Sequence, residues 1–141
     1  MLLIYLTALA GTPAQCPPVK LSAEGRTRTF IAQFANNSDG FRKTSANFTK
    51  AYAKACSEGL LKTPLIGAKA RDRRHLFLHN APDANVASIY TSGGRAVLEY
   101  AFMSDGKVNV PSVDDLHEAI FCAVHGASAK EQEESGRCLP D

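Results

Sequence analysis

The sequence predicts one α+β domain, in which two helices pack on one face of an antiparallel meander of three to four strands. Two amphipathic segments, at residues 41–60 and 112–125, enclose short segments with strand-like patterns between residues 75 and 110. The order helix, strands, helix favours a layer of helices on one face of a single sheet. The opposite face of that sheet then needs another cover, or it is available to a partner.

The first helix is predicted by apolar side chains that recur on one side of residues 41–60. Their spacings of seven, four, four and four residues form a single helical stripe: Phe41, Phe48, Tyr52, Cys56 and Leu60. Ser38 or Asp39 is a suitable N-cap, and Gly59 is a suitable C-terminal cap. We therefore expect one amphipathic helix over this range.

The middle of the chain has strand signals separated by turn residues. We expect strands at residues 75–79, 85–90, 96–103 and around 108–110, and irregular connections at residues 17–28 and 67–74. In the third strand, Leu98 and Glu99 point to opposite faces. Asp105-Gly106 is typical of a two-residue hairpin turn leading into the fourth strand.

The second helix is predicted after Pro111. Ser112 is a suitable N-cap, and Asp114 and Asp115 fall in the first turn, where acidic side chains suit the helix dipole. The apolar side chains of the stripe expected to be buried are Val113, Leu116, Ile120, Ala123 and Val124. Gly126 is expected to end this helix.

An apolar leader indicates export. The first ten residues carry no charge, and small residues and a proline follow them before Cys16. This pattern is typical of a secretory signal peptide. We interpret residues 1–15 as the leader and residues 16–141 as one domain, periplasmic or secreted. The alternative is that residues 2–10 form a buried strand. No later run of ~20 apolar residues predicts a membrane anchor.

The four cysteines are expected to form two disulfides. An even number of cysteines after an apparent leader favours disulfides, and no pair has the close spacing of zinc ligands. Three connectivities are possible, of which we favour Cys16–Cys56 and Cys122–Cys138. The second disulfide would tether the polar C-terminal tail, either for protection or to present residues 126–137 to a target.

Composition and charge indicate a folded domain with an uneven charge distribution. Of 141 residues, 45% are hydrophobic and 21% are charged, as in globular proteins. The net charge is +2, but its distribution is uneven. Residues 17–74 contain twelve Lys/Arg and four Asp/Glu, whereas residues 75–141 contain four Lys/Arg and ten Asp/Glu. We favour an arrangement in which the opposite charges of these two halves of the chain neutralise each other across the fold. The alternative is an exposed basic face that meets an acidic partner.

The histidines allow a catalytic interpretation but no metal site. Small secreted nucleases can present Glu, His and Arg from neighbouring strands for acid–base work on a phosphodiester. Here Glu99 lies on a predicted strand, Arg95 at its start, and His75 and His79 on a nearby strand. The histidines are too far apart to share an ion. We expect no metal and no cofactor, and no hydrolase, P-loop or dinucleotide motif occurs.

Basic residues at 69–74 are the candidate binding residues: Lys69, Arg71, Arg73 and Arg74. They could contact phosphates, but they lack the interleaved aromatics of single-strand binders, so a solvated loop is favoured and a nucleic-acid partner is not expected. Disulfides without catalytic motifs favour a small exported protein-binding module, of the inhibitor or immunity type, over an enzyme. The alternatives are a small secreted hydrolase with ribonuclease-like chemistry and a purely structural envelope component.

Overall fold

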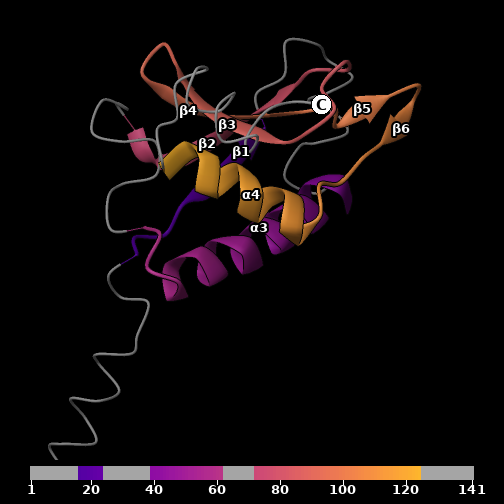
Figure 1. Cartoon of the computed structure of the whole chain (residues 1–141). Coiled ribbons are helices and arrows are strands. Elements are labelled where there is room, and N and C mark those ends of the chain that lie inside the picture. The colour runs from indigo at the N-terminus through magenta and orange to yellow at the C-terminus, as the bar shows by residue number, and fades with distance from the viewer. Residues whose placement is uncertain (1–15, 24–38, 62–71, 125–141) are drawn as a thin grey trace, which may run out of the picture.

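The protein has an α+β fold, seen in a computed structural model that describes residues 16–23, 39–61 and 72–124, without the side chains of Asp72 and Arg73. Its elements in chain order are β1 (Lys20–Ala23), α3 (Asp39–Ser57), β2 (Asp72–Asn80), β3 (Ser88–Ser92), β4 (Arg95–Tyr100), β5 (Met103–Ser104), β6 (Lys107–Val108) and α4 (Val113–Val124). Figure 1 shows α3 and α4 side by side, both on the same face of the four-stranded sheet. The leader and the C-terminal tail lie outside the described residues.

The sheet is mixed, so the expected antiparallel meander is wrong. Its strand order is β1-β2-β4-β3; β1 and β4 both run parallel to β2, and only β3 and β4 are antiparallel. After β2 the chain forms the edge strand β3, turns back at Gly93-Gly94, and places β4 between β3 and β2. Alternation along each strand is the same in either strand order, and therefore the pattern could not distinguish them.

Two segments expected to be irregular are strands. Residues 20–23 form β1, and β2 begins at Asp72, so Arg73 and Arg74 belong to a strand and not to a loop. β1 lies in register with β2, with Lys20 beside His75. A four-residue strand that follows two prolines has too little alternation to be recognised without its partner.

The Asp105-Gly106 turn is confirmed, but it joins a separate hairpin. Asp105 and Gly106 have φ values of +50° and +74°, as a two-residue hairpin turn requires. The strands that it connects, β5 and β6, form a two-stranded sheet of their own and do not extend the main sheet. The expected fourth strand of the meander is therefore absent from the four-stranded sheet.

The predicted helix over residues 41–60 is confirmed, with bounds at Asp39 and Ser57. Gly59 caps its C-terminus with φ +75°. The Gly59 N–H donates to the Cys56 carbonyl, and the Leu60 N–H donates to the Ala55 carbonyl, both at 3.0 Å. This pair of hydrogen bonds is the Schellman arrangement, which satisfies carbonyls at the end of a helix.

The most buried side of α3 is lined by small residues. Thr44, Ala51 and Ala55 are fully buried beside Phe48, whereas most of the predicted stripe packs at the margin of the core. Small side chains allow α4 to approach α3 closely. The predicted stripe of α4 is confirmed, since Leu116 and Ile120 are fully buried.

One disulfide, Cys16–Cys56, is present within the described residues and confirms the first expected pairing. It joins the segment before β1 to the last turn of α3, where the Tyr52 hydroxyl also donates to the Pro17 carbonyl. Cys122 lies on α4 and carries no free thiol. Its expected partner, Cys138, lies outside the described residues, so the pairing Cys122–Cys138 stays a prediction.

Candidate acid–base site on the sheet

The four-stranded sheet has an inner face against the helices and an opposite face, called here the outer face. Leu76, Leu78, Ala96 and Leu98 are buried on the inner face. Alternation and strand register place the following side chains on the outer face: Lys20 and Ser22 of β1; His75, Phe77 and His79 of β2; Arg95, Val97 and Glu99 of β4; and Ser88, Tyr90 and Ser92 of β3. Neither described helix lies on this face.

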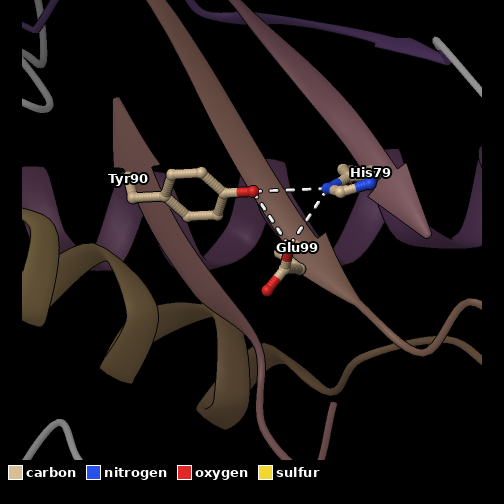
Figure 2. Close-up of polar contacts among 3 residues, drawn as sticks. All are labelled: His79, Tyr90 and Glu99. Carbon is tan, nitrogen blue, oxygen red and sulfur yellow. Dashed lines mark hydrogen bonds and ion pairs between the residues drawn. The ribbon is translucent and has the colours of Figure 1, made fainter. Parts of the chain in front are cut away.

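His79, Glu99 and Tyr90 meet on the outer face. The parallel register of β2 and β4 sets His79 directly beside Glu99, and Tyr90 reaches the same point from β3. Nδ1 of His79 lies 3.0 Å from Oε2 of Glu99. The Tyr90 hydroxyl donates to the same Oε2 at 2.9 Å and lies 3.2 Å from Nδ1 of His79 (Figure 2). Three neighbouring strands thus supply one polar cluster.

The contact with Glu99 determines which ring nitrogen of His79 carries the proton. An ionised carboxylate only accepts hydrogen bonds, so its contact with Nδ1 requires a proton on that nitrogen. In neutral imidazole, Nε2 then carries a lone pair and can accept a proton. Figure 2 shows this second ring nitrogen turned away from both Glu99 and Tyr90. The cluster therefore has the arrangement of a base whose tautomer is held by a carboxylate.

The cluster is accessible from solvent. The side chains of His79 and Glu99 are 36% and 31% exposed, respectively. Solvent therefore reaches both side chains, while the strands below hold them at fixed register. A site on strands is more precisely positioned than one on loops.

Arg95, the third residue of the predicted catalytic set, lies beside the cluster without joining it. Arg95 and Glu99 are four residues apart on β4, which is ~13 Å along a strand. The Arg95 guanidinium stacks over the ring of Phe77, with its central carbon 4.8 Å from the ring centroid. The structure therefore brings together His79 and Glu99, and it places Arg95 on the same face at a neighbouring position.

Tyr90 was not among the residues singled out by sequence. A signal for it exists in the hairpin between β3 and β4, because the Gly93-Gly94 turn sets Tyr90 opposite Val97 and Ser88 opposite Glu99. Tyr90 is thus diagonal to Glu99, a spacing at which long side chains interact.

The predicted binding residues are only partly described. Lys69 and Arg71 lie outside the described residues, Arg73 belongs to β2, and Arg74 is an exposed residue of β2. On α4, His117 lies 2.8 Å from Glu58, the residue that follows α3, and so links the two helices. Among the described residues, no three His, Cys, Asp or Glu side chains gather closely enough to hold a metal ion.

Comparison with known proteins adds no family to this picture, because no family model, no curated protein and no solved structure matches the chain. Within the described part of the chain, neither helix is long and apolar enough to cross a membrane.

Proposed function

We propose that the protein is a small exported hydrolase that cleaves RNA by acid–base chemistry, with His79 as the general base. The observation that carries this proposal is the 3.0 Å contact between Nδ1 of His79 and Oε2 of Glu99, with Nε2 turned away from Glu99 and Tyr90. A base held by a carboxylate is the arrangement that activates hydroxyl nucleophiles. Export is supported by the Cys16–Cys56 disulfide, since such bonds persist in oxidising compartments.

The contacts of His79 favour RNA as the substrate. Its described partners are Tyr90 and Glu99, so no serine or cysteine nucleophile is among them. RNA carries its own nucleophile, the 2′-hydroxyl next to the scissile phosphate. A site that supplies a base and an orienting carboxylate has the groups that activate this internal nucleophile.

The reaction is an in-line transfer at phosphorus. Nε2 of His79 takes the proton of the 2′-hydroxyl as the 2′-oxygen bonds to phosphorus. The bond from phosphorus to the 5′-oxygen breaks, and that oxygen takes a proton from solvent, which leaves a 2′,3′-cyclic phosphate. Glu99 stabilises the imidazolium that forms, and the Tyr90 hydroxyl holds Glu99 in place.

The test measures cleavage of a fluorogenic RNA and of DNA of the same sequence. The wild-type protein should cleave RNA to products with cyclic phosphate ends and leave DNA intact. His79→Gln should lower kcat by about 10²-fold or more, the range for loss of a general base. Tyr90→Phe removes one hydrogen bond to Glu99 and should lower kcat by about fivefold, equivalent to ~1 kcal/mol.

Two matched variants make the result specific. Glu99→Gln keeps the shape of the side chain but removes its charge, so it should lower kcat with little change in KM. His117→Gln removes a histidine from α4, away from the outer face, and should retain wild-type activity per folded molecule. Activity that is absent in the wild type, or equal in His79→Gln, would refute the proposal.

A protein-binding module of the inhibitor type is the second candidate, and the β5–β6 hairpin favours it. Figure 1 shows this hairpin extending away from the main sheet. Asn80 accepts a hydrogen bond from the Met103 N–H, and Asn109 donates to the Ala101 carbonyl, both at 2.8 Å, so the base of the hairpin is braced. Val108 on β6 is 40% exposed. A braced hairpin with an exposed apolar side chain suits insertion into an enzyme cleft.

This second candidate is tested against a panel of secreted hydrolases: a muramidase, a serine protease and a ribonuclease. Inhibition of one enzyme by the wild-type protein, lost in Val108→Ser, would support it. Inhibition of none would remove the inhibitor interpretation.

A further inference from the structure

The outer face holds a stacked cation–aromatic pair beside the His79–Glu99 cluster. Arg95 of β4 is exposed, and its guanidinium lies over the half-buried ring of Phe77 on β2. Along β2, His75 is the outer-face neighbour of Phe77 on the side away from His79, and the two ring centroids are 6.2 Å apart. Lys20 of β1 lies beside His75 in register. The face therefore continues from the cluster as an aromatic and cationic row.

The spacing of this row matches a chain of nucleotides. Phe77 and His79 are successive outer-face residues of β2, which are ~7 Å apart along a strand. This separation is comparable with that between neighbouring nucleotides in an extended single strand. A phosphate at His79 would therefore place the adjacent base over Phe77 and Arg95.

From this juxtaposition we propose that Arg95, together with the Phe77 ring beneath it, is a stacking platform for the base next to the scissile phosphate, so that the substrate is single-stranded RNA. Unpaired bases stack on aromatic rings and on arginine guanidinium planes. Arg95 is exposed and its guanidinium lies against the Phe77 ring, so an unpaired base could stack on this pair of side chains. This inference deepens the proposed function and rests on it for the choice of substrate.

The platform could not be recognised in the linear sequence. In the basic stretch at residues 69–74 no aromatic residue alternates with the cations. In the fold, the cation and the aromatic ring come from β4 and β2, eighteen positions apart in the chain. The pairing of these two strands creates the stack that the linear sequence lacks.

The test uses a fluorescent oligonucleotide of mixed sequence with 2′-O-methyl groups, which cannot be cleaved because it has no free 2′-hydroxyl. Binding is measured by fluorescence anisotropy. Arg95→Lys keeps the charge but loses the planar group, and Phe77→Leu keeps apolar volume but loses the ring. Each should weaken binding by about tenfold, which is within the range for loss of one stacked base. Lys50→Gln, on the exposed side of α3, is the matched loss of a charge and should bind as the wild type does.

The outcomes separate the platform from the catalytic proposal. Weaker binding by Arg95→Lys and Phe77→Leu, with tighter binding to single strands than to a duplex of the same sequence, supports the platform. Unchanged binding by both variants, or no binding by the wild type, overturns it. If the wild type binds the 2′-O-methyl strand through Arg95 but cleaves no RNA, the platform stands and the catalytic role of His79 fails. If it cleaves RNA and Arg95→Lys changes neither binding nor KM, the catalytic role of His79 stands and the platform fails.

Discussion

Replacing both Cys16 and Cys56 by alanine removes the covalent link between the start of β1 and the last turn of α3. The cross-linked residues are 40 positions apart in the chain. For a closed loop of this length, the chain-entropy model gives ~4 kcal/mol of stabilisation at 25 °C, through the constraint on the unfolded state. Because domains of this size are stable by roughly 5–15 kcal/mol, we expect a large loss in the free energy of unfolding.

The assay is urea denaturation at equilibrium, followed by circular dichroism, for the wild type and the double variant. The unfolding free energy should fall by ~4 kcal/mol, with a decrease in Tm on the order of 15 °C. Tyr52→Phe is the control, because it removes the hydrogen bond to the Pro17 carbonyl but keeps the covalent link. That variant should lose about 1 kcal/mol.

Hydrogen exchange then shows where the native state is affected. Amides of β1 in the double variant should exchange faster than in the wild type, because β1 has four residues and, within the described strands, it lies at the edge of the sheet and pairs with β2. A loss of less than about 1 kcal/mol, together with unchanged exchange in β1, would show that packing of β1 is sufficient and that the entropic reasoning is wrong.

Three further perturbations test the fold. Leu116 is 0% exposed, so Leu116→Ala should lower the free energy of unfolding by about 2–5 kcal/mol in urea denaturation; a loss below ~1 kcal/mol would contradict its place in the core. The Ser112 hydroxyl accepts a hydrogen bond from the Asp115 N–H at 3.1 Å, and Ser112→Ala should therefore cost about 1 kcal/mol in thermal denaturation, whereas Ser112→Asp should retain stability. Burial, and then the charge of Asp115, raise the pKa of Tyr100 above its usual value of 10.0. The native state therefore resists ionisation of Tyr100, which contributes stability below pH 10 that is lost as pH rises through the raised pKa. Urea midpoints measured across this range should fall less steeply for Tyr100→Phe, and equal slopes would contradict the burial argument.

The helices could be predicted because their signals are local. Apolar spacing, the Gly59 cap and the Ser112 cap all act within a few residues, and the structure has helices at both places. The exact buried side of α3 could not be predicted. It depends on how closely α4 approaches, and that approach favours Ala51 and Ala55 over the larger side chains of the stripe.

The sheet could be predicted only as a set of strands. Pairing β1 with β2 joins residues 20–23 to residues 75–78, and no local pattern reports such a contact. The same limit applies to the candidate site. Sequence could place His79 and Glu99 on strands, but only the parallel pairing of β2 with β4 sets them side by side, and only the β3–β4 hairpin brings in Tyr90.

The parallel pairing of β1 with β2 also has a consequence for the order of assembly. β1 precedes β2 by about fifty residues, so during synthesis or translocation from the N-terminus β1 has no partner strand for some time. Cys56 lies between them, and it emerges before β2 does. The Cys16–Cys56 bond can therefore close while the sheet is still incomplete, and it then holds β1 against α3 until β2 arrives. In this sequence of events the disulfide precedes the strand pairing, and the availability of an oxidant would set the order in which the sheet is built.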